Sequence, residues 1–282
     1  MSILSKTISH LTSGFSTDHY YKSMNEALKR LNKEYTMLHY PYHLEENDSF
    51  LEAQKNLTDF CISKLSPING KKILEIGCGN GVQAKYILDK YTPESMVGID
   101  LNPTNIEIAK SEAKRLEICN ITFHIDDAQQ LSTIESESMD YIINIESAFH
   151  YPDKASFLRE VFRVLKPGGT FLIADILTLH GRKMPFRKMW KKKMNLHHWP
   201  LETYNKELIK AKLHVVSFSD ITNKVIHGFQ NYRYWLKSLK KKNFIEDLFI
   251  KIYYSIHVEL NMHLLRSRRQ YCVFVGKRPF GT

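Results

Sequence analysis

The sequence predicts an α/β fold in which a mostly parallel sheet is covered by helices on both faces. Between residues 71 and 177, short apolar segments alternate with segments of helical spacing, an order that builds parallel sheets. The apolar segments contain few alternating polar residues, which is typical of strands buried on both faces. Glycines or acidic residues follow three of these segments, at the sheet edge where such folds bind ligands.

The first elements are a helical N-terminal segment and two strand–helix units. Residues 17–60 have apolar residues at helical spacing, interrupted by a loop at "HYPYHLEEND". "KKILEIG" then predicts a strand, residues 81–90 a helix, and "SMVGID" a second strand. The next helix is expected to begin near Pro103, with Asn102 as its cap.

Three further strands are predicted at "ITFHID", "MDYIINIE" and "GTFLIADI". Between the last two, apolar residues at 157, 158, 161, 162 and 165 have the spacing of a helix, and "KPGG" predicts a turn into the next strand. The segment 223–268 predicts a helical insertion rich in aromatic residues, and "YCVFVGKRP" the last strand.

Composition limits the class of protein. A hydrophobic content of 43% is ordinary for a globular chain of 282 residues. The sequence contains no run of about 20 apolar residues and no pattern of a secretion signal. The four cysteines are scattered, which favours neither a disulfide framework nor a zinc site. We therefore expect a protein of the reducing cytoplasm.

The charge of the chain is divided unevenly. Residues 180–282 carry 22 Lys+Arg and 6 Asp+Glu, a net charge of +16, whereas the preceding residues have a net charge of −6. This basic lobe has two interpretations that remain open. It is either a solvated Lys-rich surface or a binding surface for an anionic partner such as a substrate, a membrane or a nucleic acid.

The stretch "ILEIGCGNGVQ" predicts a ligand-binding loop after the first strand. Gly77, Gly79 and Gly81 give G-x-G-x-G, whereas the dinucleotide motif G-x-G-x-x-G needs a glycine at Val82. Asp100 ends the second strand 19 residues later, where a carboxylate can accept ribose hydroxyls, and "DDAQQL" follows the third strand. Acids at three strand ends favour a nucleoside with a cationic amino-acid tail over a pyrophosphate. Glu75 would help to orient backbone groups or a ligand ammonium.

These motifs together resemble the class I S-adenosylmethionine-dependent methyltransferases. "ILEIGCGNG", "GIDLNP", "DDAQQL", "MDYIINIESAFHYPD" and "REVFRVLKPGGTFLIADI" carry the resemblance in order from about residue 71 to 177. It is closest to the small-molecule branch, with its sugar and natural-product O-methyltransferases, tocopherol and sterol C-methyltransferases, and glycine or sarcosine N-methyltransferases. The resemblance implies a Rossmann-like fold with a seven-stranded, mostly parallel sheet, a helical N-terminal segment and helical lid insertions.

The resemblance also implies a domain organisation and a cofactor. Residues 1–60 would form a helical N-terminal cap, 61–180 the cofactor-binding core, 181–213 a basic lid insertion, and 214–282 the remaining strands with a helical insertion, all within one catalytic domain. The cofactor would be S-adenosyl-L-methionine and the product S-adenosyl-L-homocysteine. The residues expected at the cofactor are Glu75, Gly77, Cys78, Gly79, Gly81, Asp100, Leu101, Asp127, Ala128 and Ile145.

Two residues are candidates for activating the acceptor. His150 follows the fourth strand in "IESAFHYP", and an imidazole with an ordinary pKa of about 6.5 accepts a proton at neutral pH. Asp175 ends "IAD" in the fifth strand, and in related O-methyltransferases matching histidine and aspartate positions form the activating pair. A loop histidine bonded to backbone and a loop-bracing aspartate remain the structural alternatives. The other histidines form no metal-ligand pattern, so we expect no metal.

The acceptor is expected to lie against aromatic and basic segments. "YTMLHYPYH" resembles the family segment that closes over the cofactor, with proline and histidine in place of glycine and tryptophan, and we expect Tyr40 to contact the acceptor. After the fifth strand, Met189 and Trp190 belong to one face of a basic amphipathic segment, either as lid packing or as a substrate wall.

Three functions remain open from the sequence. The first is O-methylation of an apolar or aromatic small molecule. The second is C- or N-methylation of a lipid or prenyl-like acceptor, with the basic lobe in peripheral contact with an anionic membrane. The third is RNA methylation or nucleic-acid binding, which is disfavoured because "IESAFHYP" stands where nucleobase methyltransferases carry an Asn/Asp-Pro-Pro-aromatic motif. The oligomeric state is open, with a dimer as one alternative.

Overall fold

The computed structural model describes residues 17–45, 48–65, 67–179, 195–238 and 244–281. The elements of the first half are α2 (Thr17–Asn32), α3 (Phe50–Ser63), β1 (Lys72–Ile76), α4 (Val82–Lys90), β2 (Ser95–Asp100), α5 (Pro103–Arg115), β3 (Ile121–Ile125) and β4 (Met139–Ile145). The elements of the second half are the 3-10 helix η1 (Ala148–His150), α6 (Lys154–Val164), β5 (Leu165–Thr178), α8 (Leu201–Lys210), β6 (His214–Asp220), α9 (Thr222–Ser238), α10 (Phe244–Ser267) and β7 (Arg269–Lys277).

Seven strands form one sheet in the order β3-β2-β1-β4-β5-β7-β6. The first five strands are parallel to their neighbours, and β7 runs antiparallel to both β5 and β6. The strand order reverses between β1 and β4, which is where an open α/β sheet leaves a crevice at the carboxyl ends of its strands. The structure thereby confirms the predicted α/β, Rossmann-like, mostly parallel seven-stranded sheet.

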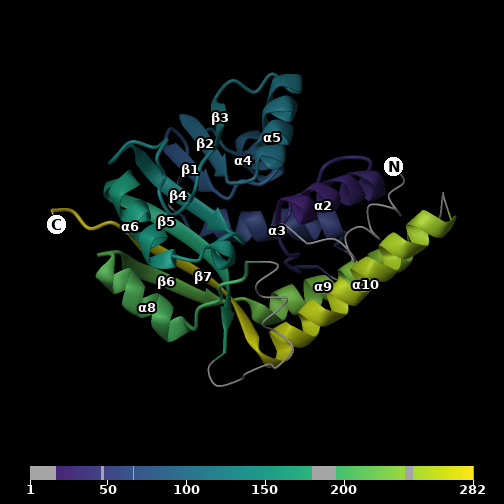
Figure 1. Cartoon of the computed structure of the whole chain (residues 1–282). Helices are drawn as coiled ribbons and strands as arrows, with labels where there is room; N and C mark the ends of the chain where they lie inside the picture. Colours follow the sequence, from purple (N-terminus) through teal and green to yellow (C-terminus); the bar gives the residue numbers. More distant parts are fainter. Residues whose placement is uncertain (1–16, 46–47, 66, 180–194, 239–243, 282) are drawn as a thin grey trace.

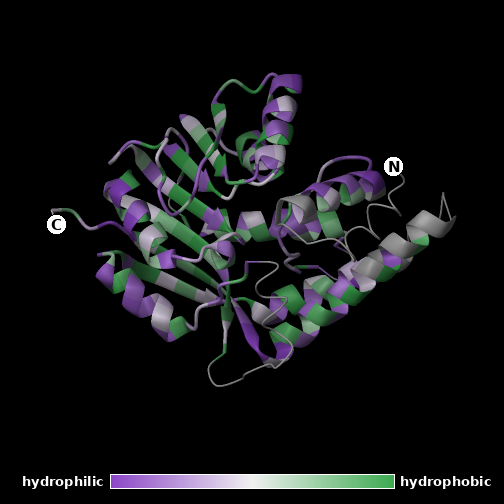
Figure 2. Ribbon diagram, viewed as in Figure 1, coloured by the Kyte–Doolittle hydropathy of each residue, from purple (hydrophilic) through white to green (hydrophobic). Residues whose placement is uncertain are grey.

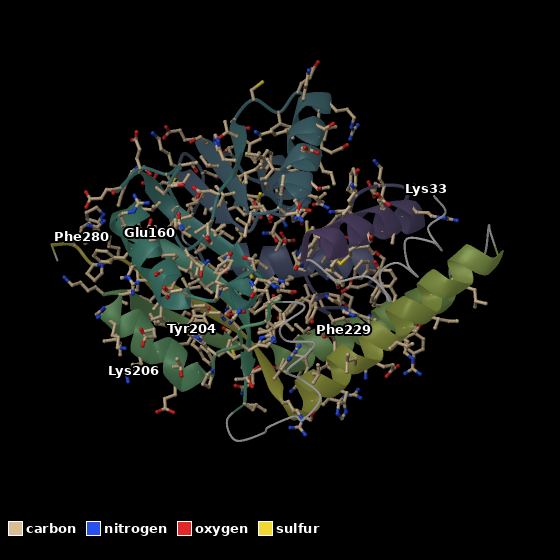
Figure 3. The ribbon with its side chains drawn as sticks, in the orientation of Figure 1. Lys33, Glu160, Tyr204, Lys206, Phe229 and Phe280 are labelled. Atoms are coloured by element: carbon tan, nitrogen blue, oxygen red, sulfur yellow. The ribbon has the colours of Figure 1, made fainter. Side chains whose placement is uncertain are left out.

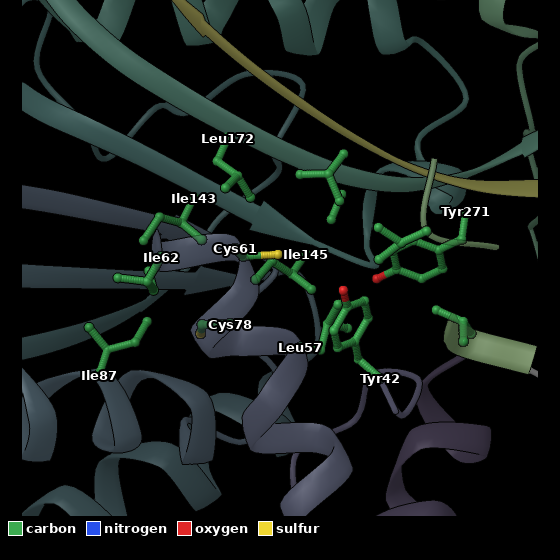
Figure 4. Close-up of a cluster of buried hydrophobic side chains, with 14 of the residues drawn as sticks. Tyr42, Leu57, Cys61, Ile62, Cys78, Ile87, Ile143, Ile145, Leu172 and Tyr271 are labelled. Atoms are coloured by element: carbon green, nitrogen blue, oxygen red, sulfur yellow. The ribbon is translucent and has the colours of Figure 1, made fainter. Parts of the chain in front are cut away.

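Helices cover both faces of this sheet (Figure 1). One hydrophobic cluster joins the sheet to α3, α4, α5, α9 and α10. In Figure 4, Leu57 and Cys61 of α3 approach Ile143 and Ile145 of β4 within this cluster. A second cluster joins the opposite face to α6 and α8. The two labelled rings Tyr204 of α8 and Phe229 of α9 in Figure 3 belong to these opposite faces.

The hydropathy of the elements explains these layers. Figure 2 shows hydrophobic residues concentrated along the central strands and many hydrophilic residues on helices such as α8, which buries Tyr204 and Leu208 on its inner side. β1 and β4 are buried along almost their whole length. Apolar strands of this kind need cover on both faces, and amphipathic helices supply it.

Local signals account for several boundaries. The Asn102 side chain accepts a hydrogen bond from the Asn105 backbone N–H at 3.2 Å, so it caps α5 as predicted, with Pro103 at the first helical position. One predicted boundary differs from the structure. "KPGG" does not separate α6 from the strand, because β5 already begins at Leu165 and includes these residues, with Gly168 at a φ of 79°.

The predicted lid insertion, residues 181–213, needs a partial correction. Residues 180–194 lie outside the described residues. Residues 201–210 form α8, and this helix packs on the sheet with fully buried Tyr204 and almost fully buried Leu208. Its apolar stripe is therefore part of the second core layer and not of a lid.

The predicted helical insertion, residues 223–268, contains the helices α9 and α10 between β6 and β7, while residues 239–243 lie outside the described residues. α9 and α10 lie side by side on the face that also carries α3 (Figure 1). Gly228 in α9 permits a close approach, because a Cβ there would lie 2.6 Å from the carbonyl oxygen of Pro41. Among the described residues, no helix has the length and apolar character needed to cross a membrane.

Candidate active site

The glycine loop between β1 and α4 has the backbone shape that its sequence predicts. Gly77, Gly79 and Gly81 have φ values of 73°, 53° and 79°, in the left-handed region that other residues adopt at a cost. Gly77 also lies against the end of β4, because a Cβ there would be 2.2 Å from the Ser147 hydroxyl oxygen. Three glycines therefore allow a tight turn at the carboxyl end of β1.

Asp100 ties this loop to the end of β2. Its carboxylate accepts hydrogen bonds from the Gly79 backbone N–H at 2.9 Å and from the Asn102 backbone N–H at 2.8 Å. Burial nevertheless raises the pKa of Asp100, because the surrounding protein removes solvent from the carboxylate. The side chain holds the loop in place and also faces a cavity beside it.

A first cavity of about 480 Å³ opens at the carboxyl ends of β1, β2 and β4. Nine of the ten residues predicted at the cofactor line it: Glu75, Gly77, Cys78, Gly79, Asp100, Leu101, Asp127, Ala128 and Ile145. Leu101 is 68% exposed at its rim, whereas Cys78 is buried, which raises the pKa of the thiol well above its usual range. The fold thus brings these nine predicted residues together at one cavity.

Gly81 is the one predicted cofactor residue that does not line the first cavity. It instead caps the N-terminus of α4. A Cβ at this position would lie 2.8 Å from the Cβ of Ala109 on α5. Gly81 therefore allows α4 and α5 to pack closely, and its contribution to the cavity is indirect.

Glu75 is a buried acid on the cavity wall. It is 1% exposed, and one carboxyl oxygen accepts a hydrogen bond from the Gln83 amide at 2.6 Å. Its other oxygen, Oε2, makes no hydrogen bond with the described residues. Burial, with a smaller contribution from Asp100, raises the pKa of Glu75 to about 8. A cationic ligand in the first cavity would offset the cost of ionising this carboxyl.

Two adjacent acids follow β3 and differ in their environments. Asp126 accepts hydrogen bonds from the backbone N–H groups and hydroxyls of Ser132 and Thr133, so it braces the turn that carries Ala128. Asp127 accepts from the backbone and the side-chain amide of Gln129 at 2.9 Å. Both residues also line the first cavity.

A second cavity of about 400 Å³ adjoins the first. Its walls come from α2, the segment 37–41, α3, η1, the residues that follow position 195, and the helices α9 and α10. Aromatic and aliphatic side chains predominate: Tyr20, Met24, Leu28, Phe50, Phe149, Phe229, Tyr232, Tyr254 and Leu264. A cavity of this size and lining suits an apolar small molecule.

Tyr40 lines the second cavity at its border with β4. Its ring packs edge-on against Phe229, with 4.6 Å between the centroids, and its hydroxyl donates to the Asn261 side chain at 2.7 Å. Its backbone N–H donates to Glu146 Oε1 at 2.6 Å. The other two predicted acceptor contacts, Met189 and Trp190, lie outside the described residues.

Six residues line both cavities: Tyr21, Met37, Leu38, His39, Glu146 and His150. Glu146 follows β4 with a φ of 54°, a conformation unusual for a residue with a side chain. His150 ends η1, and its Nε2 lies 2.8 Å from the Tyr21 hydroxyl. An imidazole therefore stands where a group in one cavity would meet a group in the other.

Asp175 does not join His150 at this border, which corrects the predicted pair. It is completely buried on the opposite face of the sheet, where its carboxylate accepts hydrogen bonds from Lys154 Nζ at 2.7 Å and the Tyr204 hydroxyl at 3.0 Å. β5 continues past it to Thr178, and the next residue, Ile176, is the one that lines the second cavity. Asp175 thus forms a buried ion pair between β5, α6 and α8.

Sequence reasoning missed Tyr21, Asn261 and Arg269. Tyr21 belongs to α2 and Asn261 to α10, and neither stands in a motif with a fixed distance from the glycine loop. The aromatic run "DHYYK" was the one available signal for Tyr21. The described residues contain no group of three His, Cys, Asp or Glu side chains placed to hold a metal ion.

Comparison with known proteins agrees with this geometry. A family model described as a methyltransferase domain matches residues 68–238. The chain is 29% identical over 216 residues to erythromycin 3''-O-methyltransferase from Saccharopolyspora erythraea, covering 72% of this chain and 69% of that protein. It is 38% identical over 133 residues to phthiotriol/phenolphthiotriol dimycocerosates methyltransferase from Mycobacterium leprae, with 47% of each chain covered.

A solved structure supports the fold. The chain superposes on geranyl diphosphate C-methyltransferase from Streptomyces coelicolor, solved with Mg²⁺, geranyl-S-thiolodiphosphate and S-adenosyl-L-homocysteine, with a TM-score of 0.72. The match covers 93% of this chain and 96% of that one at 14% identity. At this level of sequence identity, the match supports a shared fold but does not identify the acceptor.

Proposed function

The chain belongs to the class I S-adenosylmethionine-dependent methyltransferases, and on that premise we propose that it methylates a hydroxyl group of an apolar or aromatic small molecule. The observation that carries the proposal is the meeting of two cavities at His150, one lined by the glycine loop and acids, the other by apolar and aromatic side chains. S-adenosylmethionine, when bound, supplies a methyl group on a positively charged sulfur that a nucleophile on the acceptor can displace.

The first cavity fits this cofactor. Asp100 stands at the end of β2, where its carboxylate can accept hydrogen bonds from ribose hydroxyls. Glu75 offers a buried carboxyl oxygen that makes no hydrogen bond with the described residues and has a raised pKa. A positively charged amino-acid tail would satisfy that oxygen and favour its ionised form. Ala128 and Ile145 supply apolar contacts on the same lining.

The second cavity fits an apolar acceptor. Its walls are largely aromatic and aliphatic and reach the border where His150 lies, so they could align an apolar acceptor with the cofactor, which is a main task in methyl transfer. A hydroxyl is a weak nucleophile until its proton is removed. Two histidines, His39 and His150, line both cavities, and burial lowers the pKa of His39 to about 4, which makes it a weak base, so we assign His150 the role of accepting that proton.

Replacement of His150 by alanine tests this role. We expect turnover of hydroxyl acceptors to fall by roughly 10²–10⁴-fold, the usual range for a general base. Wild-type turnover should decline on the acidic side of its pH profile, because only neutral imidazole accepts a proton. S-adenosylhomocysteine affinity, measured by calorimetry, should change little. His214→Ala on the exposed edge strand β6 is the matched control.

Near-normal turnover of His150→Ala would remove the general base from the mechanism and leave catalysis by alignment. An unchanged acidic limb in that variant would likewise assign the pH dependence to another group. Absence of cofactor binding to the wild-type protein would defeat the proposal as a whole.

A second candidate is C- or N-methylation of a lipid or prenyl-like acceptor at an anionic membrane. Ile252, Ile256 and Leu260 are 47%, 64% and 44% exposed at four-residue spacing on α10, so they form an apolar stripe on one face of the helix. Leu260 also lines the second cavity. This stripe would bring the mouth of the cavity to a lipid surface, and the net charge of +16 in residues 180–282 favours an anionic one.

Flotation with vesicles of phosphatidylglycerol and phosphatidylcholine tests the membrane contact. The wild-type protein should float with the anionic vesicles at low salt, and Ile256→Ser should reduce the floating fraction severalfold. Ile209→Ser is the matched control, since Ile209 is 75% exposed on α8. Flotation that is absent, or equal for the two variants, would reject the stripe as a membrane contact.

A further inference from the structure

The second cavity has an uneven distribution of charge. Among the described residues that line it, Arg269 is the only lysine or arginine and Glu146 is the only aspartate or glutamate. Burial raises the pKa of Glu146 to about 8, so the carboxyl is mainly protonated at neutral pH. Burial lowers the pKa of His39 to about 4, and burial with the charge of Arg269 lowers that of His257 to about 4. Arg269 therefore carries a permanent positive charge on a lining whose acid is held neutral.

Arg269 has a fixed place in the fold. It is the first residue of β7 and pairs with Thr178 at the carboxyl end of β5, on the sheet edge that carries both cavities. It is 7% exposed, and it lines the second cavity but not the first. It therefore belongs to the acceptor side of the border marked by His150.

Polar groups accompany Arg269 on this part of the lining. The charge of Arg269 acts on the Tyr40 hydroxyl and on His257, and the Tyr40 hydroxyl donates to the Asn261 side chain at 2.7 Å. We call Tyr40, His257, Asn261 and Arg269 the polar corner. The remaining lining is largely aromatic or aliphatic. The cavity thus combines apolar walls with one cationic region, which is the complement of an amphiphilic anion.

We propose that the polar corner binds a carboxylate or phosphate group on the acceptor, with Arg269 as its main contact, so that the preferred acceptor is an apolar acid. This inference rests on the proposed function only in identifying the second cavity as the acceptor site. A guanidinium presents several N–H donors in one plane and pairs with carboxylate or phosphate oxygens through two parallel hydrogen bonds. The apolar walls around the polar corner would strengthen such charge-assisted hydrogen bonds, because little water competes for them there.

Binding measurements with simple probes test the proposal independently of turnover. Octanoate, octyl phosphate and the uncharged octanol are titrated by calorimetry into the protein saturated with S-adenosylhomocysteine. We expect at least one anion to bind about 10–100-fold more tightly than octanol, as charge-assisted hydrogen bonds imply. The ratio of octanoate to octyl phosphate affinity identifies which anion the corner prefers.

Variants of Arg269 assign the preference to this residue. Arg269→Gln should abolish the preference for the anion and leave octanol affinity nearly unchanged, whereas Arg269→Lys should retain part of it. Arg266→Gln, three residues earlier and exposed on α10, should behave as wild type. Unfolding curves and S-adenosylhomocysteine affinity of each variant establish that it is folded. If Arg269→Gln fails to fold, the wild-type comparison of anions with octanol still decides whether a preference exists.

Equal affinity of the anions and octanol for the wild-type protein would overturn the proposal, as would failure of all three probes to bind. An anion preference that survives in Arg269→Gln would also overturn it. None of these outcomes bears on methyl transfer itself. Conversely, loss of cofactor binding would defeat the proposed function, while the comparison of probes in the protein without cofactor would still be readable.

Discussion

The hydrogen bond between Tyr21 and His150 determines which nitrogen of the imidazole can accept a proton. Partial burial and the carboxyls of Asp100 and Glu146 raise the pKa of Tyr21 well above its usual range, so the phenol keeps its proton. The oxygen of this phenol can accept a hydrogen bond from His150 Nε2–H across the 2.8 Å separation, which places the lone pair of neutral histidine, the one that accepts a proton, on Nδ1. Tyr21 thus holds the ring in one tautomer and orientation.

Tyr21→Phe should separate orientation from proton acceptance. Loss of one hydrogen bond should lower kcat by about 3–10-fold, well short of the loss expected for His150→Ala. The acidic limb of the pH profile should persist but shift, because the imidazole loses its hydrogen bond to the phenol. Steady-state kinetics of both variants across pH provide the measurement. A rise in turnover would instead show that the hydrogen bond to Tyr21 hinders proton acceptance by the imidazole.

At the scale of elements, α2 is joined to the glycine loop and to α5 by buried amides. Asn25 is 2% exposed, and its side chain donates to Asn105 Oδ1 at 2.9 Å and accepts from Asn80 Nδ2 at 2.8 Å. Asn105 in turn lies 3.5 Å from the Asp100 carboxylate. This chain of contacts couples the N-terminal helix, which carries Tyr21, to the residue proposed to bind the ribose.

Asn25→Ala should therefore weaken cofactor binding although Asn25 lies outside the lining of the first cavity. Removal of the amide leaves Asn105 Oδ1 without this donor inside the protein, which costs about 1–3 kcal/mol of local stability. We expect S-adenosylhomocysteine affinity to fall several-fold and amide hydrogen exchange in α2 to accelerate. Asn32→Ala is the control, because the Asn32 amide donates within α2 to the Leu28 carbonyl.

If exchange in α2 accelerates while affinity is unchanged, the helix covers the site without supporting the cofactor pocket. If neither hydrogen exchange nor affinity changes, the hydrogen bonds between Asn25, Asn80 and Asn105 make no measurable contribution to the stability of α2 or to cofactor binding.

At the scale of the whole molecule, two buried acids make stability depend on pH. Burial is the main cause that raises the pKa values of Glu75 and Glu146, each to about 8 from an ordinary 4.5. Between these values the folded state holds protons that the unfolded state has released, so the free energy of unfolding decreases as pH rises from about 4.5 towards 8. This contribution to the free energy of unfolding is fully present below the ordinary pKa of 4.5. It is lost as pH rises through the folded-state pKa of about 8.

Glu75→Gln should flatten this dependence in the protein without cofactor. Urea midpoints measured at pH 5, 6, 7 and 8 should fall with pH in the wild type and fall less in the variant, because glutamine cannot ionise. S-adenosylmethionine should also flatten the wild-type curve, since a cationic ligand favours the ionised carboxyl. Glu107→Gln on the exposed face of α5 is the control and should follow the wild type. A wild-type midpoint independent of pH would contradict the prediction.

The elements and most of the first cavity could be read from neighbouring residues. Apolar runs, helical spacing and the Asn102–Pro103 cap predict the order of strands and helices, because these signals act within a few residues. The three glycines adopt the positive φ values that their spacing indicates. Parallel strands end at one edge, so residues after β1, β2, β3 and β4 meet there whatever the rest of the chain does.

Only the tertiary structure determines which residues line the second cavity. Asp175 and Ile176 are neighbours on β5, yet one faces α6 and α8 while the other lines the second cavity, because side chains of a strand alternate between faces. A predicted strand at these positions therefore does not indicate whether Asp175 or Ile176 faces the second cavity. Tyr21 and Arg269 reach the surroundings of His150 from α2 and β7, more than 100 residues away in either direction. Their positions depend on how distant elements pack on the sheet, and no local pattern of residues encodes that packing.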